Sequence, residues 1–292
     1  MATTATVPAG DQVDGPPAQL SGRVALVTGA SRGIGAAVAE QLVRAGVRTA
    51  LVSRDLEAVT AVSRRLQDAG GIALPLGRDL SDPASASEAV ATAASALGAI
   101  DLLVNNAASV GPLGPTVRVP VEQWGMTLNL NLVSALATIS AALPDMLARS
   151  FGRIVNVSSG AASGSGMLGA SAYSASKAGL EMLTRNLAAE LSGTGVAVVA
   201  VRPGRVDTDM QVFLRAQDAD AVGPTIVDRA RAFLTDGHLI DPAVPAALIV
   251  RLMQTGLSGA AVSVYDERGR ALLADVPYVG ANARPKRTSG ER

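Results

Sequence analysis

Short runs of aliphatic and β-branched residues alternate with longer stretches of helical pattern along nearly all of this 292-residue chain. The short runs are apolar throughout, which is typical of strands buried on both faces of a sheet. Strands that alternate with helices run parallel, and right-handed crossovers place the helices on both faces. The sequence therefore predicts an α/β fold with a single doubly wound parallel sheet of about seven strands.

The expected elements are spaced regularly between residues 24 and 264. Strands are expected at 24–27, 49–52, 72–75, 102–104, 154–157, 196–201 and 261–264, where the apolar runs are short. Helices are expected at 36–45, 55–69, 83–97, 121–148 (bent near Pro144), 173–191 and 242–254. We expect one domain over residues 21–279, with a substrate lid at about 210–239 and flexible tails at 1–20 and 280–292.

Composition excludes several classes of function. The chain has no cysteine, so disulfides, thiolate metal sites and cysteine nucleophiles are impossible. The only histidine is His238, which argues against a histidine-based triad or a multi-histidine metal site. Basic and acidic residues both number 25, so no binding to nucleic acid is expected.

The apolar segments also bear on membranes and on the cellular compartment. No uninterrupted apolar run is long enough for a spanning helix, so no membrane partner is expected. The first twenty residues lack the basic start and apolar stretch of a secretory signal. The sequence therefore predicts a cytoplasmic protein.

A glycine-rich turn joins the first expected strand to the first expected helix. It reads Thr28-Gly29-Ala30-Ser31-Arg32-Gly33-Ile34-Gly35. Glycines let a backbone turn sharply and approach a pyrophosphate, and the following helix offers unpaired N–H groups to it. The alternative is a tight turn with no ligand. The position between strand and helix favours a dinucleotide site.

The end of the second strand discriminates between the two nicotinamide dinucleotides. An acid there holds the ribose 2′-hydroxyl of NADH, whereas an arginine accepts the 2′-phosphate of NADPH. This chain has Ser53 followed by Arg54, with Arg32 in the glycine turn. Asp55 would repel a phosphate, but a helix cap is the better explanation for it. The sequence therefore predicts NADP(H).

Tyr173 and Lys177 lie four residues apart on an expected helix and so share one face. A nearby ammonium can lower the pKa of a tyrosine, so Tyr173 could act as a proton donor whose pKa Lys177 adjusts. A solvated helix face is the alternative for an isolated pair of this kind. Ser158 and Ser159 favour the first interpretation, because they end the fifth strand at the edge where such sheets bind ligands.

Further residues fall in order around these groups. Asp79 and Leu80 follow the third strand, Asn105-Asn106-Ala107-Ala108 ends the fourth, Asn131 lies seven residues after Trp124, and Pro203, Gly204, Val206 and Thr208 follow the sixth. With the glycine turn, Ser159, Tyr173 and Lys177, this order resembles the short-chain dehydrogenase/reductase family of NADP type, over about residues 22–266. The resemblance implies a Rossmann-type fold and hydride transfer between NADPH and a carbonyl or alcohol carbon.

The resemblance also implies a role for each matched residue. Ser159 would hydrogen-bond the substrate oxygen, Tyr173 would transfer the proton, and Lys177 would hold the nicotinamide ribose and lower the pKa of Tyr173. Asn131 would hold a water that relays protons. The residues implied to contact the cofactor are Gly29, Ser31, Arg32, Gly33, Ile34, Gly35, Ser53, Arg54, Asp79, Leu80, Asn106, Ala107, Tyr173, Lys177, Pro203, Gly204, Val206 and Thr208. Family members pair across a two-fold axis, so a homodimer or homotetramer is expected.

Two departures from the family pattern leave alternatives open. Ala108 replaces a glycine and could crowd the backbone beside the cofactor. Ser159 lies fourteen residues before Tyr173, where thirteen is more usual, so Ser158 or Ser163 could be the active hydroxyl. Apolar residues in the expected lid predict a small, largely apolar and uncharged carbonyl or alcohol substrate. The rival functions are a catalytically idle NADP(H) sensor, a lyase or epimerase of related fold, and a structural partner.

Overall fold

A computed structural model of the chain describes residues 18–276, so residues 1–17 and 280–292 of the expected tails and residues 277–279 of the expected domain lie outside the described part. Its core is a parallel sheet in the order β3-β2-β1-β4-β5-β6-β7. The strands are β1 (Val24–Thr28), β2 (Arg48–Ser53), β3 (Ala73–Gly77), β4 (Leu102–Asn105), β5 (Gly152–Val157), β6 (Val196–Arg202) and β7 (Ala261–Ser263). This order confirms the doubly wound α/β fold predicted from the sequence.

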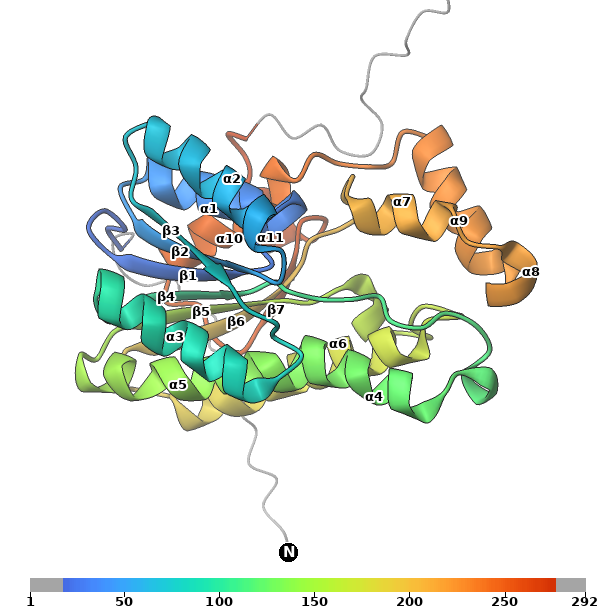
Figure 1. Ribbon diagram of the computed structural model, residues 1–292, viewed down its shortest axis with the longest axis horizontal. Helices are drawn as coiled ribbons and strands as arrows, with labels where there is room; N and C mark the ends of the chain where they lie inside the picture. Colours follow the sequence, from blue (N-terminus) through green and yellow to red (C-terminus); the bar gives the residue numbers. More distant parts are fainter. Residues whose placement is uncertain (1–17, 277–292) are drawn as a thin grey trace, which may run out of the picture.

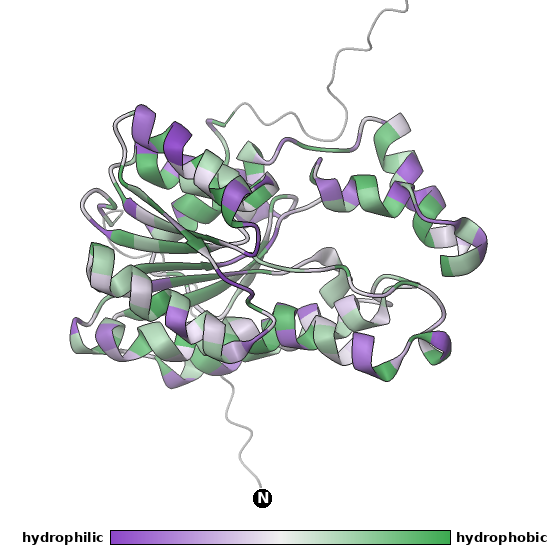
Figure 2. Cartoon of the chain, viewed as in Figure 1, coloured by the Kyte–Doolittle hydropathy of each residue, from purple (hydrophilic) through white to green (hydrophobic). Residues whose placement is uncertain are grey.

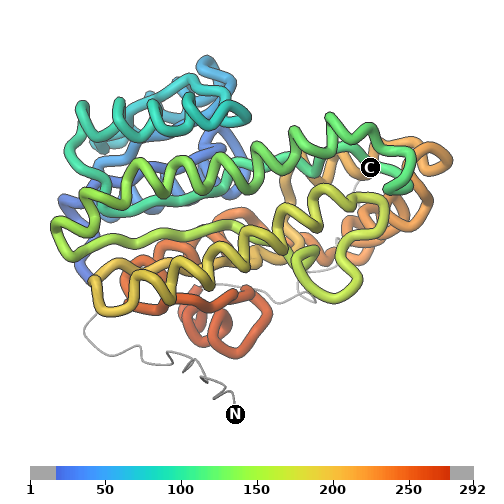
Figure 3. Tube along the Cα trace, turned by 90° about the horizontal axis from the view of Figure 1, so that it is seen from below, coloured from blue at the N-terminus to red at the C-terminus, as the bar shows by residue number. Residues whose placement is uncertain are grey.

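Helices cover both faces of the sheet, as Figure 1 shows. One layer contains α1 (Gly33–Arg44), α2 (Leu56–Asp68), α10 (Ala243–Met253) and the short α11 (Glu267–Leu272). The other contains α3 (Pro83–Leu97), α5 (Ser134–Ala148) and α6 (Ser171–Glu190), which lie in one layer in the view from below (Figure 3). The chain therefore places its two catalytic candidates, Tyr173 and Lys177, on a helix that covers the sheet.

The strands explain why two layers are needed. In β1, Val24 and Leu26 belong to the apolar core beneath α3 and α5, whereas Ala25 and Val27 belong to the core beneath α1 and α10. Successive side chains of a strand point to opposite faces of the sheet, so an unbroken apolar run is buried only if helices cover both faces. Figure 2 shows the resulting hydrophobic colouring along the central strands.

The helix expected at 121–148 is not regular. It consists of α4 (Val121–Leu128), a π-helical turn (Asn129–Val133) and α5. Pro144 lies inside α5, so the irregularity falls at Asn131 rather than near the proline. π-helical turns are rare and occur often at functional sites, which directs attention to Asn131.

Val121–Ala148 is also the one described helix that is long and apolar enough to cross a membrane. It packs instead against α3 and α6 and carries the buried polar side chains of Asn131, Ser134 and Thr138. Its apolar character is therefore that of a helix covering a sheet.

The segment expected as a lid contains three helices. They are α7 (Asp209–Arg215), α8 (Ala219–Val222) and α9 (Pro224–Thr235), and they extend from the main body of the fold (Figure 1). α9 begins with Pro224 directly after Gly223, a combination that favours a helix start. Leu214, Ile226 and Val227 pack with Tyr173 in a third, smaller apolar core. This packing joins the three helices to the candidate catalytic helix.

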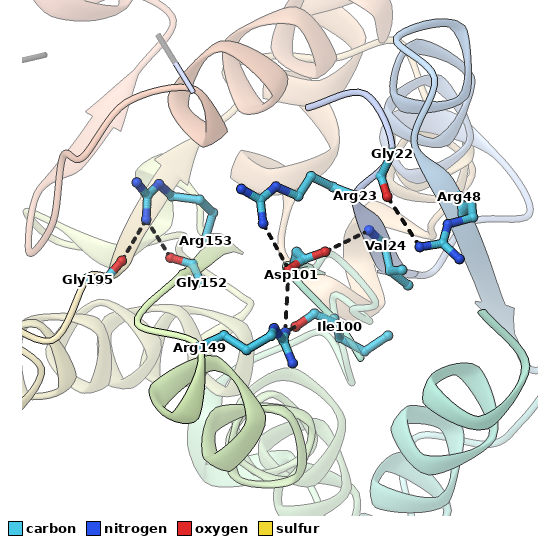
Figure 4. Close-up of polar contacts among 10 residues, drawn as sticks. All are labelled: Gly22, Arg23, Val24, Arg48, Ile100, Asp101, Arg149, Gly152, Arg153 and Gly195. Atoms are coloured by element: carbon cyan, nitrogen blue, oxygen red, sulfur yellow. Dashed lines mark hydrogen bonds and ion pairs between the residues drawn. The ribbon is translucent and has the colours of Figure 1, made fainter. Parts of the chain in front are cut away.

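Polar contacts link the edge of the sheet at which the strands begin (Figure 4). The buried carboxylate of Asp101 accepts a 3.0 Å hydrogen bond from the backbone N–H of Val24 and lies 3.4 Å from both Arg23 and Arg149. Arg153 donates to the carbonyls of Gly152 and Gly195. These bonds tie neighbouring strands together at this edge.

Candidate active site

The glycine turn is possible only with glycine at particular positions. Gly29 has φ +65°, in the left-handed region. A Cβ atom on Gly35 would lie 2.2 Å from the carbonyl oxygen of Gly29 and 2.6 Å from the side-chain nitrogen of Asn106. Neither position can carry a side chain unless the backbone shifts. The turn thus brings bare backbone to the amino end of α1, as the dinucleotide hypothesis requires.

Thr28 and Asn106 fix the turn to the loop after β4. The Asn106 Nδ2 donates to the carbonyls of Thr28 and Gly29 at 2.9 and 3.1 Å. The Thr28 hydroxyl oxygen accepts from the backbone N–H groups of Asn106 and Ala107 at 2.9 and 3.0 Å. The loop also accommodates Ala108 in ordinary backbone geometry, because Ser150 is the one described non-glycine residue with positive φ.

The end of β2 has the side chains that the NADP(H) hypothesis needs. The hydroxyls of Ser53 and Ser31 are 3.1 Å apart, which links this strand end to the glycine turn. Asp55 accepts a 2.9 Å hydrogen bond from the backbone N–H of Ala58 and caps α2. The helix-cap interpretation of Asp55 is therefore confirmed. Arg54 is exposed beside it.

Arg32 occupies the position before α1 and reaches toward the lid. Its guanidinium lies 3.0 Å from the carboxylate of Asp209 at the start of α7, and both side chains are mostly exposed. An exposed ion pair of this kind is worth little, so Arg32 can exchange Asp209 for another anion at small cost.

Asp79 and Leu80 have different environments at the end of β3. Asp79 accepts hydrogen bonds from the backbone and hydroxyl of Ser81 at 2.9 and 2.8 Å. These bonds lower the pKa of Asp79, with a further contribution from the charge of Arg54. Leu80 is buried in the core beneath α3. Asp79 is therefore an ionised, exposed hydrogen-bond acceptor, and its neighbour Leu80 anchors this part of the chain in the core.

Tyr173 and Lys177 share one face of α6 at the carboxyl edge of the sheet, and both are buried. The Lys177 Nζ lies 5.8 Å from the centre of the Tyr173 ring and donates a 2.7 Å hydrogen bond to the carbonyl of Val157, at the end of β5. The lysine thus ties its helix to the strand that carries Ser158 and Ser159.

The pKa shifts of the pair differ from the expectation. Burial raises the pKa of Tyr173, and the hydrogen bond with Ser159 offsets this only in part. Burial lowers the pKa of Lys177 to about 8. The pKa of Tyr173 is therefore raised in this structure, not lowered as expected, and desolvation is the largest cause of the shift. Tyr173 is protonated at neutral pH, which suits a proton donor.

Asn131 lies in the π-helical turn and has its side chain fully inside the protein. Its Nδ2 donates to the Ser109 carbonyl at 2.8 Å and to the Ser176 hydroxyl at 3.0 Å, and its Oδ1 accepts from the Ser109 N–H at 2.9 Å. Ser176 is the neighbour of Lys177 on α6. Asn131 therefore joins the loop after β4 to α6, the helix of Tyr173 and Lys177.

The three candidate serines have distinct partners. The Ser158 hydroxyl is buried and donates a 2.7 Å hydrogen bond to Glu181. Ser163 is exposed and donates to the carbonyl of Gly160 at 3.3 Å. Ser159 accepts from the Ala161 N–H at 3.1 Å and hydrogen-bonds to Tyr173. Of the three hydroxyls, that of Ser159 meets the tyrosine.

Glu181 and Arg202 form an ion pair behind the site that the sequence analysis did not single out. Arg202 donates to both carboxylate oxygens of Glu181 at 2.7 Å. Burial opposes the ionisation of Glu181, but the hydrogen bonds from Arg202 and Ser158 outweigh it and lower its pKa. The pair joins α6 to the end of β6, one residue before Pro203.

A cavity of about 390 Å³ opens between Ser159 and the lid helices. Apolar and arginine side chains share its wall: the lining residues include Met167, Leu168, Leu214, Ile226, Phe233, Tyr265, Arg202, Arg205 and Arg229. Gly204 lies in its wall with φ +84°, while Val206 is buried and Thr208 begins α7. The Tyr265 hydroxyl accepts a 3.1 Å hydrogen bond from the N–H of Arg205.

Sequence reasoning did not identify Arg205, Arg229, Phe233 or Tyr265 as site residues. A signal existed for two of them, because Arg229 and Phe233 are four residues apart after the helix-start pair of Gly223 and Pro224. Tyr265 follows β7 and Arg205 belongs to the loop after β6, so only the folded chain brings them together.

Comparisons with known proteins agree with this geometry. The family model for short chain dehydrogenases matches residues 23–219. The chain is 35% identical over 234 residues to the 3-oxoacyl-(acyl-carrier-protein) reductase of Vibrio harveyi, and the match covers 80% of this chain and 90% of that protein. It is 40% identical over 197 residues to the cis-4-hydroxycyclohexanecarboxylate dehydrogenase of Sinomonas cyclohexanicum, covering 66% and 77% of the two chains.

A solved structure gives the same result in three dimensions. A variant of the actinorhodin polyketide ketoreductase, crystallised with NADPH, superposes with a TM-score of 0.75 at 32% identity, over 85% of this chain and 97% of that one. Fold, site geometry and sequence therefore agree, and this chain belongs to the short-chain dehydrogenase family of oxidoreductases.

Proposed function

We propose that this protein is an NADPH-dependent carbonyl reductase or alcohol dehydrogenase. One observation carries the proposal: Ser159 lines a cavity and hydrogen-bonds to Tyr173, and the Lys177 Nζ lies 5.8 Å from the centre of the Tyr173 ring. Carbonyl reduction needs a hydrogen bond to the substrate oxygen and a proton for it, and these residues offer both.

The chain has a set of residues that fits NADPH. Gly29 and Gly35 permit a tight turn that a Cβ atom at either position would force open, and the turn leaves bare backbone for a pyrophosphate. Arg54 directly follows Ser53, which takes the place of an acid at the end of β2, and Arg32 follows Ser31, whose hydroxyl contacts that of Ser53; both arginines are exposed. Two guanidinium groups are suited to a 2′-phosphate. When bound, the nicotinamide supplies or accepts the hydride.

The residues of the chain handle the substrate oxygen and its proton. Ser159 donates a hydrogen bond to the carbonyl oxygen, and Tyr173, which burial keeps protonated through its raised pKa, donates its phenolic proton to the same oxygen. Lys177 holds the nicotinamide ribose and provides positive charge near the phenolate when the proton leaves. Asn131 positions Ser176 and α6 through its hydrogen bonds, and its proton-relay role stays a prediction.

The substrate is a small carbonyl or alcohol compound. The cavity of about 390 Å³ limits its size, and Met167, Leu168, Leu214 and Ile226 give it an apolar wall for the carbon skeleton. Two of the relatives are named for a 3-oxoacyl and a hydroxy-carboxylate substrate, which supports chemistry at a carbonyl or alcohol carbon.

Variants of the hydroxyl groups test the function. Tyr173→Phe removes the proton donor and keeps the ring, so NADPH oxidation with reactive dicarbonyls should fall by about 10²-fold or more while NADPH affinity is unchanged. Ser159→Ala should also lower turnover. Ser163→Ala is the matched control and should leave turnover unchanged, because Ser163 is exposed outside the cavity wall.

The same assay distinguishes the alternatives. A catalytically idle sensor would bind NADPH and oxidise none with any substrate of a broad panel. A lyase or epimerase would convert its substrate without net NADPH oxidation. Near-normal reductase activity of Tyr173→Phe would show that Tyr173 is not the acid.

We also propose a homodimer or a tetramer built from it. Large apolar side chains are exposed along α4, α5 and α6, at Val121, Met126, Leu136, Leu147 and Met182. Such a surface favours contact with a second copy across a two-fold axis.

A further inference from the structure

The cavity wall contains positively charged side chains as well as apolar ones. Arg202, Arg205 and Arg229 line it, and no aspartate or glutamate is among the described lining residues. Arg202 is neutralised by its two hydrogen bonds to Glu181. Arg205 and Arg229 have no such partner, since none of the ion pairs among residues 18–276 includes either of them.

Phe233 orients these two guanidinium groups. The Cζ atoms of Arg205 and Arg229 lie 4.4 and 5.8 Å from the centre of its ring. Arg229 and Phe233 are one turn apart on α9, while Arg205 comes from the loop after β6. Cation–π contacts of this kind hold a guanidinium plane in place without cancelling its charge. Two positive charges are thus held near one aromatic ring in the cavity wall.

Gln211 adds an unpaired polar atom to the same wall. Its Oε1 is buried and has no hydrogen-bond partner among the described residues. A buried acceptor without a donor costs free energy, so a ligand that brings a hydroxyl or an N–H to it gains affinity. The cavity wall therefore contains Ser159, which hydrogen-bonds to Tyr173, together with two arginines and Gln211.

We propose that the substrate is a small oxo acid, or the matching hydroxy acid, whose carboxylate binds Arg205 and Arg229 while its carbonyl or alcohol meets Ser159 and Tyr173. The inference rests on the proposed function and names its substrate class. A carboxylate matches the planar fork of a guanidinium, and its charge relieves the repulsion between the two arginines. The apolar residues of the cavity contact the carbon skeleton, so the expectation of an uncharged substrate is replaced.

Binding to the NADP⁺-loaded enzyme tests the inference without turnover. Pyruvate, acetoacetate and levulinate place the carbonyl at increasing distance from the carboxylate, and each has a methyl ester that removes the charge. By isothermal titration calorimetry, at least one acid should bind about tenfold or more tightly than its ester, the gain expected for a charge-assisted hydrogen bond. If every ester bound as tightly as its acid, the inference would be wrong.

Variants connect the preference to the two arginines. Arg229→Met and Arg205→Met should each weaken acid binding by about tenfold or more and leave ester binding within about twofold. Arg231→Met is the matched control, because Arg231 is exposed on the same helix but outside the cavity wall. Unchanged acid affinity in both test variants would overturn the assignment.

Two further arms separate the remaining outcomes. Stronger binding of dihydroxyacetone phosphate than of any acid would assign the arginines to a phosphate and refute the carboxylate. NADPH oxidation with the same compounds tests the proposed function separately. Turnover of esters without a preference for acids would overturn the inference alone, whereas acid-selective binding without any turnover would support it and overturn the reductase function.

Discussion

Gly35→Ala tests whether the glycine turn is built for close backbone approach. The new Cβ would lie 2.2 Å from the Gly29 oxygen and 2.6 Å from the Asn106 Nδ2. Both neighbours are fixed, because the Asn106 Nδ2 donates to the Gly29 carbonyl at 3.1 Å and to the Thr28 carbonyl at 2.9 Å. The turn must therefore open, and at least one of these hydrogen bonds must lengthen or break.

The magnitude follows from these two effects. Overpacking in a fixed environment costs about 1–3 kcal/mol, and a lost hydrogen bond adds about 1 kcal/mol. We expect Gly35→Ala to lower the free energy of unfolding by about 2–4 kcal/mol. A domain of ordinary stability survives such a loss, so the variant should still fold. Because the opened turn no longer matches a pyrophosphate, NADPH affinity should fall by about tenfold or more.

Urea unfolding gives the first quantity, and fluorescence titration with NADPH gives the second. Gly256→Ala is the matched control, since Gly256 is exposed, has no positive φ and has nothing within 4 Å of its added Cβ. It should change stability by no more than about 1 kcal/mol and leave NADPH affinity unchanged. If Gly35→Ala matched the wild type in both measurements, the argument from close approach would fail.

Three shorter predictions concern the cofactor, the proton and the assembly. Arg54→Asp should reverse a wild-type preference for NADPH over NADH in binding titrations, and equal wild-type affinity for both would refute NADP(H) selectivity. Because burial lowers the pKa of Lys177 to about 8, its ammonium is lost as the pH rises through that value, so reductive kcat/KM should fall there; a level pH profile would contradict this role. Light scattering at micromolar concentration should give a dimer or tetramer, and a monomer would count against the apolar surface as an interface.

Local patterns in the sequence were sufficient to predict the fold. Unbroken apolar runs such as Val24–Thr28 require cover on both faces, and the helical stretches between them provide it. The glycine spacing indicated the backbone turn, and the separation of Tyr173 and Lys177 placed both on one helix face. These features depend on residues close together in the chain, where periodicity determines which way each side chain points.

The tertiary structure decided what depends on contacts between distant segments. It distinguished Ser159 from Ser158 as the candidate hydroxyl, because the Ser158 hydroxyl donates a hydrogen bond to Glu181 on α6. It also determined the sign of the Tyr173 pKa shift, since burial by other elements outweighs the hydrogen bond with Ser159. Arg205 and Arg229, twenty-four positions apart, meet only at Phe233. Sequence spacing specifies neighbours along an element, whereas desolvation and the convergence of charges arise only when separate elements pack together.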